Sequence, residues 1–130
     1  MKKLLLISTL LFSTLIFSTP SYGEWTKVTT NVDGTTFYAD LDRIRKHDGY
    51  VYWWDLTDYL KPKNGYFSSK FYIQGDCKLF RMKDVSALFY KEPMGKGPGL
   101  DVEIQGKYGN WKYPPPNTAG EEILKLVCGQ

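Results

Sequence analysis

The chain has 130 residues, of which 17 are Lys or Arg and 14 are Asp or Glu, for a formal net charge of +3. Two of the positive charges, Lys2 and Lys3, lie in the first 23 residues, so residues 24–130 are close to neutral. A neutral segment of this length can bury one modest hydrophobic core, and it lacks the positive field of a general nucleic-acid-binding protein. We therefore expect one domain and no nucleic-acid partner.

Residues 1–23 have the pattern of a secretory signal peptide. The two lysines precede an apolar run from Leu4 to Phe17, and Pro20 and small residues at 21 and 23 follow it. The run is short for a bilayer span, which needs about 20 residues, although an uncleaved N-terminal anchor stays open as the alternative. No cysteine directly follows the run. We expect cleavage before Glu24, one domain over residues 24–130, and a periplasmic, secreted or surface location without a lipid anchor or transmembrane segment.

Both cysteines of the chain, Cys77 and Cys128, lie in the predicted mature part. Two cysteines in an exported chain most simply form one disulfide, and the chain-entropy model assigns such a loop a stabilisation of about 4 kcal/mol. Free or metal-binding thiols are the alternative. Metal binding has little support, because the chain has one histidine and no C-x-x-C pair.

The first half of the domain is predicted to form strands separated by turns. Alternating residues predict strands at 25–30 and 36–39, with an Asp33-Gly34 turn between them. The spacing of apolar residues in 40–46 indicates one helical turn with Asp40 as its N-cap. Residues 50–60 form the strongest predicted strand, and both of its faces begin apolar, which indicates a central position. One face carries Tyr52, Trp54 and Leu56, and the other carries Val51, Trp53, Asp55 and Thr57.

The second half continues with a turn over 61–65, a strand over 67–73 and an extended run over 79–90. A loop rich in Gly and Pro covers 92–100, and 111–113 is a brief predicted strand. A helix then begins at Thr118, whose hydroxyl and Glu121 form a capping box. Its apolar stripe consists of Ile123, Leu124, Val127 and Cys128.

None of the candidate catalytic residues is placed in the sequence in a way that indicates enzyme activity. His47 and Asp48 are adjacent on a predicted turn, where we expect a solvated histidine and no geometry for base catalysis. Asp55 and Asp58 fall on opposite faces of their strand, which disfavours a pair of catalytic carboxylates. The sequence therefore predicts no enzyme, no cofactor and no metal site.

Basic and aromatic residues alternate in the middle of the chain. Paired strands could assemble them into one surface suited to acidic protein segments or anionic polysaccharides. The alternative is a solvated sheet face whose lysines protect its edges. The candidate binding surface consists of Lys61, Lys63, Lys70, Tyr72, Arg81 and Lys83.

Several segments together resemble the bacterial surface-adhesin protein E family. They are Trp25, the run Phe37-Tyr38-Ala39-Asp40 with Ile44, the run Val51-Tyr52-Trp53-Trp54-Asp55-Leu56, Lys70, Cys77, Met94-Gly95, Trp111-Lys112-Tyr113 with its prolines, and residues 122–128. The resemblance implies an α+β fold, an antiparallel and mostly meandering sheet of about six strands with one C-terminal helix, tethered by a Cys77–Cys128 disulfide. It also implies binding to host extracellular-matrix and serum proteins such as vitronectin and laminin. The family's characterised member is a lipoprotein, whereas this chain lacks the acceptor cysteine after its leader.

The leading hypothesis is an exported, non-enzymatic envelope protein that binds a macromolecule, either a host matrix or serum protein or another protein of the bacterial envelope. The alternative is a periplasmic structural or inhibitor-like module that docks one bacterial envelope protein. The sequence leaves open which sheet face binds and whether the protein forms a homodimer.

Overall fold

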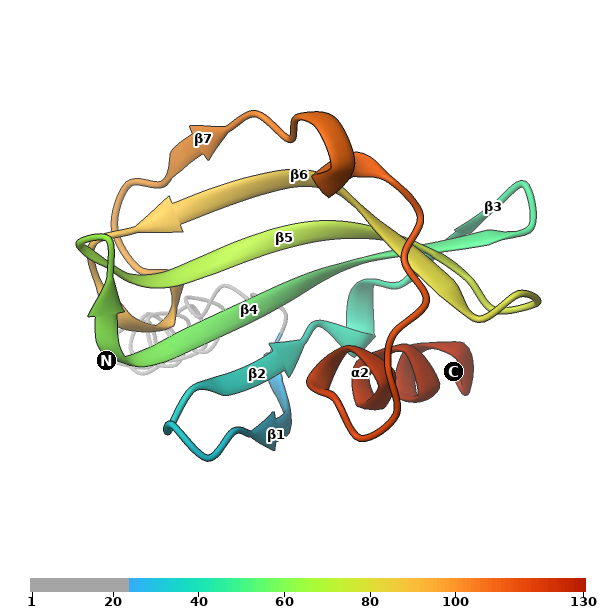
Figure 1. Ribbon diagram of the computed structural model, residues 1–130, viewed down its shortest axis with the longest axis horizontal. Coiled ribbons are helices and arrows are strands. Elements are labelled where there is room, and N and C mark those ends of the chain that lie inside the picture. Colours follow the sequence, from blue (N-terminus) through green and yellow to red (C-terminus); the bar gives the residue numbers. More distant parts are fainter. Residues whose placement is uncertain (1–23) are drawn as a thin grey trace, which may run out of the picture.

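The computed structural model describes residues 24–130, which form one antiparallel sheet with an α-helix packed against it (Figure 1). The predicted signal peptide, residues 1–23, lies outside the described residues. The predicted α+β fold with a C-terminal helix is confirmed, and the sheet has seven strands where about six were expected.

The strands are β1 (Thr26–Thr30), β2 (Thr36–Ala39), β3 (Arg45–His47), β4 (Tyr50–Lys63), β5 (Tyr66–Asp76), β6 (Arg81–Tyr90) and β7 (Leu100–Val102). Across the sheet they follow the order β1-β2-β4-β5-β6-β7, and β3 pairs with the beginning of β4. Three short 3-10 segments, η2 (Leu41–Arg43), η3 (Pro93–Gly95) and η4 (Gly106–Gly109), connect strands, and α2 (Ala119–Cys128) ends the fold.

Strand β4 is the centre of the sheet, as its two apolar faces predicted. It pairs with β2 and β3 on one edge and with β5 on the other, and Trp53 and Leu56 are both fully buried although they point to opposite faces. The expected turn over 61–65 is too long, because β4 continues to Lys63. Only Asn64 and Gly65 make the turn, both at positive φ, as a tight two-residue hairpin requires.

The hydrophobic core lies between α2 and one face of the sheet, which we call the helix face. Ile123, Leu124 and Val127 of α2 pack with a cluster of sheet residues that includes Trp53 and Ile73. No side chain could replace the hydrogen of Gly75 without moving this cluster, since a Cβ there would lie 2.7 Å from the Trp53 ring. The absence of a side chain at residue 75 therefore makes room for the tryptophan.

The start of α2 confirms the predicted cap. The Thr118 hydroxyl accepts a hydrogen bond from the Glu121 N–H at 3.3 Å, and the Glu121 carboxylate accepts one from the Asn117 N–H at 3.2 Å. These contacts satisfy amide groups at the helix start that have no partner within the helix.

The predicted Cys77–Cys128 disulfide is confirmed, and it links α2 to the sheet next to the core. Cys77 follows β5 directly, Cys128 is the last residue of α2, and their Cα atoms are 5.7 Å apart. The bond therefore fixes the end of a short helix to the end of a long strand, across 51 residues of sequence.

Two local predictions are wrong. The predicted helical turn is present as η2 and Asp40 occupies its N-cap position, but the Asp40 side chain makes no capping hydrogen bond; it is buried, and one of its oxygens lies 3.7 Å from Nε of Arg43. Residues 111–113 do not form a strand, because only Lys112 pairs with the sheet, through a single bridge to Met82. The prolines that follow cannot donate further ladder hydrogen bonds.

A bulge in β6 decides which side chains share a face. Tyr72 pairs with Ser86 and Ile73 pairs with Asp84, so Val85 is an extra residue in β6. On the far side of the bulge, Ala87 therefore points to the helix face although it differs from Asp84 by an odd number of residues. Strict alternation would have placed them on opposite faces.

Candidate binding surface

Four of the six predicted surface residues come together on the sheet face opposite α2. Lys70 and Tyr72 lie on β5, and Arg81 and Lys83 lie on β6, at register positions whose side chains all point to that face. We call this side the opposite face.

Lys61 and Lys63 lie at the hairpin end of the sheet, about 13 Å of strand from Lys70 and farther from Arg81 and Lys83. Lys63 pairs with Tyr66 at the β4–β5 hairpin, whereas Arg81 pairs with Asp76 at the other end of β5. Ten residues of extended strand span about 33 Å. Lys63 instead lies over the Tyr59 ring, with its Nζ atom 5.4 Å from the ring centre.

Aromatic rings form a row along the opposite face. The Tyr72 ring is 5.0 Å from Trp54 and 6.0 Å from Tyr52, measured between ring centres. Farther along, Tyr50 lies 5.5 Å from Trp111. Trp111 comes from the segment between η4 and α2, so sequence distance hid its place in the row.

Lys70, Arg81 and Lys83 each lie against an aromatic ring. The Nζ atom of Lys70 is 4.9 Å from the Tyr90 ring centre, and that of Lys83 is 4.8 Å from the Trp111 ring centre. The guanidinium carbon of Arg81 is 4.3 Å from the same tryptophan ring. Such contacts leave the cation accessible while fixing its position. The resulting surface, which we call the cationic–aromatic strip, consists of Trp25, Tyr52, Trp54, Lys70, Tyr72, Arg81, Lys83, Tyr90 and Trp111.

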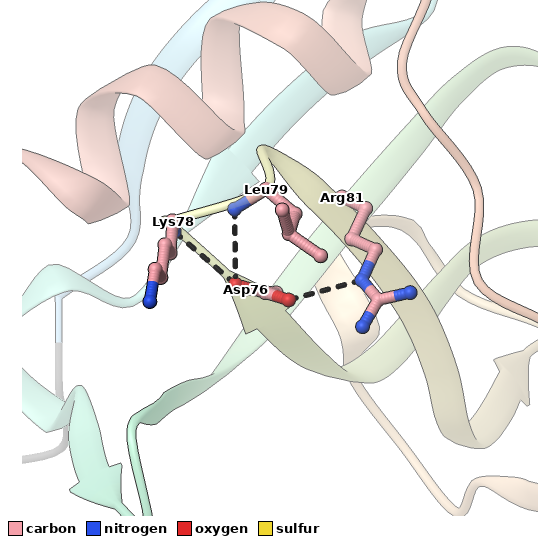
Figure 2. A network of polar contacts seen from close by, with 4 residues as sticks. All are labelled: Asp76, Lys78, Leu79 and Arg81. Carbon is pink, nitrogen blue, oxygen red and sulfur yellow. Dashed lines mark hydrogen bonds and ion pairs between the residues drawn. The ribbon is translucent and has the colours of Figure 1, made fainter.

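Asp76 positions Arg81 at one end of the strip (Figure 2). One carboxylate oxygen of Asp76 accepts hydrogen bonds from the Lys78 and Leu79 N–H groups, each at 3.1 Å, and the other accepts one from Nε of Arg81 at 3.0 Å. The Leu79 hydrogen bond and the Arg81 contact hold the pKa of Asp76 below its ordinary value. Arg81 is therefore paired within the protein, and Lys70 and Lys83 supply the less compensated charge of the strip.

A hollow of about 200 Å³ lies beside Lys70. It is lined by Trp25, Trp54 and Tyr90 and also by Asp40, one of whose oxygens is buried and has no hydrogen-bond partner among residues 24–130. An unpaired buried acceptor is costly, and a donor that reached it would be bound favourably. Sequence reasoning missed this role because it assigned Asp40 to a helix cap.

The structure separates the candidate catalytic groups. Asp58 accepts a hydrogen bond from the Met94 N–H at 2.8 Å on the opposite face, whereas Asp55 is buried on the helix face, as the alternation predicted. His47 and Asp48 do approach each other, at 3.1 Å, which corrects the expectation that their geometry forbids it. Their side chains are 55% and 80% exposed, so the predicted solvated turn is confirmed.

Asp55 has a partner that sequence reasoning did not find. The Trp53 indole N–H donates to its carboxyl group, and burial, reinforced by the charge of nearby Asp84, raises the pKa of Asp55 to about 8. The β6 bulge inserts one extra residue between Asp84 and Ser86, so it changes which β6 side chains share the helix face with Asp84. The alternation of apolar and polar residues in the sequence does not reveal this insertion.

Within residues 24–130, no helix is long and apolar enough to cross a bilayer. The surface-adhesin protein E family model matches residues 25–129. No curated protein sequence matches the chain.

Solved structures of Haemophilus influenzae protein E share the fold. One crystal form is 20% identical, with a TM-score of 0.64 over 85% of this chain and 91% of that chain. A second structure of the same protein is 19% identical, with a TM-score of 0.63 over 85% of this chain and 88% of that chain. Protein E from a non-typeable strain is 20% identical, with a TM-score of 0.58 over 86% and 79%.

Proposed function

Because the chain belongs to the surface-adhesin protein E family, we propose that it is an exported, non-enzymatic protein that binds an acidic segment of a protein partner along the cationic–aromatic strip. The strip runs over β5 and β6, and it offers partly exposed charge next to aromatic side chains. Trp, Tyr and Arg are the residue types that most often carry the binding energy of protein interfaces.

The observation that carries this proposal is the placement of Lys70 and Lys83 on rings of the same sheet face. A rigid sheet holds the two ammonium groups at fixed spacing, so a partner with matching carboxylates binds without ordering them first. Aromatic side chains between them, Trp54 and Tyr72, would cover apolar parts of the same segment.

A host extracellular-matrix or serum protein, such as vitronectin or laminin, is the proposed partner class. This class comes from the family resemblance, and the charge of the strip fits acidic segments of such proteins. Electrostatic attraction would speed association and make the affinity fall with rising salt.

The test compares two charge-matched double variants of the oxidised protein on immobilised vitronectin and laminin. Lys70→Gln with Lys83→Gln should weaken binding by about tenfold or more, since both charges and their ring contacts are lost. Lys61→Gln with Lys63→Gln removes the same charge at the distant hairpin and should leave binding almost unchanged. Equal losses in the two variants would mean that only net charge matters, and no loss in the first would remove the strip from the proposal.

A periplasmic module that docks a bacterial envelope protein is the second candidate. It is favoured by the disulfide, because Cys77 and Cys128 are the only cysteines of the chain and both are paired, so neither thiol could carry a lipid. Cell fractionation with surface protease treatment distinguishes the two candidates. A protected, exclusively periplasmic pool would contradict host binding, and a protease-accessible surface pool would contradict the docking module.

A further inference from the structure

The helix face of the sheet is only partly covered by α2. In Figure 1 the segment that leads from η4 to α2 crosses the sheet, and no α-helix of residues 24–130 lies over the parts of β4, β5 and β6 beyond it. Two hollows lie on the helix face, one of about 640 Å³ beside η4 and one of about 220 Å³ at the start of α2, and both are bordered by Phe71 and Asp84. We call the pair of hollows the helix-face cleft.

Aromatic side chains form the apolar wall of the cleft. Phe71 and Phe89 meet edge to face, with ring centres 6.0 Å apart, and Tyr108 of η4 lines the same hollow. The larger hollow has the volume of a small-molecule site. An apolar or aromatic body could therefore be enclosed between the sheet and η4.

The charged groups of the cleft are all acidic. Asp55 and Asp84 border the smaller hollow, Asp84 and Glu103 border the larger one, and no Lys, Arg or His is among the described residues that line either. On the opposite face, by contrast, the strip carries the positive charges of Lys70 and Lys83. The two faces of one sheet are thus suited to ligands of opposite charge.

Asp55 retains an acceptor without a partner. Its side chain is more than nine-tenths buried, and the Trp53 indole N–H bonds to Oδ1, whereas within residues 24–130 no donor bonds to Oδ2. Once Asp55 is ionised, this oxygen can accept a hydrogen bond from a ligand in the bordering hollow.

Lys112 shows that an ammonium group can reach this site. Its Nζ atom approaches Asp84 from the edge of β6, at 3.6 Å from Oδ2, while the lysine side chain remains 47% exposed. A half-exposed ion pair contributes little stability, so another ammonium group could replace it.

We propose that the helix-face cleft binds a small organic cation, in which an aromatic or aliphatic body lies against Phe71, Phe89 and Tyr108 and a primary ammonium group pairs with Asp84 and Asp55. The ammonium group would gain from both carboxyl groups and from the neighbouring ring faces. This site is separate from the strip and does not depend on the proposed function.

Proton release should accompany binding. Burial raises the pKa of both Asp55 and Asp84, and a cation in the cleft would favour their ionised forms. The other charged groups that face this pair are Lys112, on the edge of β6, and Glu103, after β7, while α2 contributes only Ala119, Gly120 and Ile123 to the lining.

The test titrates the oxidised, isotopically labelled protein with 2-phenylethylamine and, separately, with its neutral analogue 2-phenylethanol. We expect saturable amide shifts around Phe71, Asp84 and Tyr108 with the amine, and binding of the alcohol weaker by about fivefold or more, because a partly exposed ion pair is worth roughly 1 kcal/mol. Calorimetry in two buffers of different ionisation enthalpy should show release of a fraction of a proton with the amine alone.

Three variants separate this site from an unspecific apolar hollow. Asp84→Asn should weaken amine binding, whereas Lys112→Met should strengthen it, because the competing ammonium group is removed. Asp101→Asn is the matched control: it also removes one carboxylate near β6, but Asp101 pairs with Leu88 on the opposite face. Equal affinity for amine and alcohol, or weaker amine binding in Lys112→Met, would overturn the proposal.

Discussion

Trp53 donates its indole N–H to the carboxyl group of Asp55, two residues along the same strand, and both side chains are buried on the helix face. A carboxyl group in this position is easier to bury with its proton than without it, because the sheet and α2 exclude water. Burial accordingly raises its pKa from 3.8 to about 8.

Asp55→Asn should therefore remove a pH-dependent cost of folding. The native carboxyl holds its proton up to about pH 8, whereas in the unfolded chain it ionises near pH 3.8, so wild-type stability falls as pH rises between these values. Asn keeps an oxygen for the Trp53 N–H and cannot ionise. The free energy of unfolding of the variant, relative to that of the wild type, should therefore rise by up to about 1.4 kcal/mol per pH unit in this window.

Urea unfolding of both proteins from pH 5 to pH 9 measures this gain. Asp101→Asn, at an exposed carboxylate, serves as the control and should run parallel to the wild type. A constant difference between Asp55→Asn and the wild type at every pH would show that Asp55 is ionised in the native protein.

Cys128→Ser should lower the free energy of unfolding by about 4 kcal/mol, as the chain-entropy model gives for a loop of this length. The loss should also free the last turn of α2, since the disulfide joins Cys128 to the end of β5. Hydrogen exchange at Leu126 and Val127 measures the second effect, and thermal unfolding measures the first. Reduction of the wild type should reproduce both; a reduced wild type as stable as the oxidised one would contradict the role of the tether.

The long central strands β4, β5 and β6 were predictable from the residue pattern of each segment, whereas the short strands β3 and β7 were not predicted. Both faces of β4 are apolar in the sequence, and both bury a large side chain, Trp53 on one and Leu56 on the other. The Thr118 cap and the apolar stripe of α2 are likewise local features, and local features suffice to place a helix.

The surfaces were harder to predict because they depend on contacts between distant segments. Trp111 completes the strip from beyond η4, and Asp84 meets Asp55 through strand pairing. The bulge at Val85 shifts the alternation of β6, and no glycine or proline marks it. Lys61 and Lys63 were assigned to the surface because they are close to its other residues in sequence. In the fold they lie at the β4–β5 hairpin, and the strip extends toward the other end of β5.

Ser68→Ala should loosen the turn at η3. The Ser68 hydroxyl donates to the Glu92 carbonyl at 2.6 Å and accepts from the Gly95 N–H at 2.8 Å, and its side chain is fully buried. Alanine leaves two backbone groups without partners, at a cost of about 1–3 kcal/mol for a buried group. Hydrogen exchange of the Gly95 amide should accelerate, while Ser69→Ala, which removes only a contact to the Tyr59 hydroxyl, should leave it unchanged. Unaltered exchange in Ser68→Ala would mean that η3 is held by packing alone.

Asp76→Asn should destabilise the protein at neutral pH and lose this effect in acid. Asparagine still offers an oxygen to the Lys78 and Leu79 N–H groups, so the turn after β5 can persist, but the charge that holds Arg81 is gone. Because these contacts lower the pKa of Asp76, its contribution is complete above its ordinary pKa and disappears as pH falls through the lower native value.

The melting temperature of the variant should therefore lie a few degrees below that of the wild type at pH 7, and the two curves should converge towards pH 2. Asp48→Asn is the exposed control, since the Asp48 side chain is 80% exposed and pairs only with His47 at the surface. A difference that persists at pH 2 would assign the loss to hydrogen-bond geometry in the turn. Convergence would assign the loss to the charge of Asp76, which accepts the hydrogen bond of the Arg81 side chain that lies over Trp111 at one end of the strip.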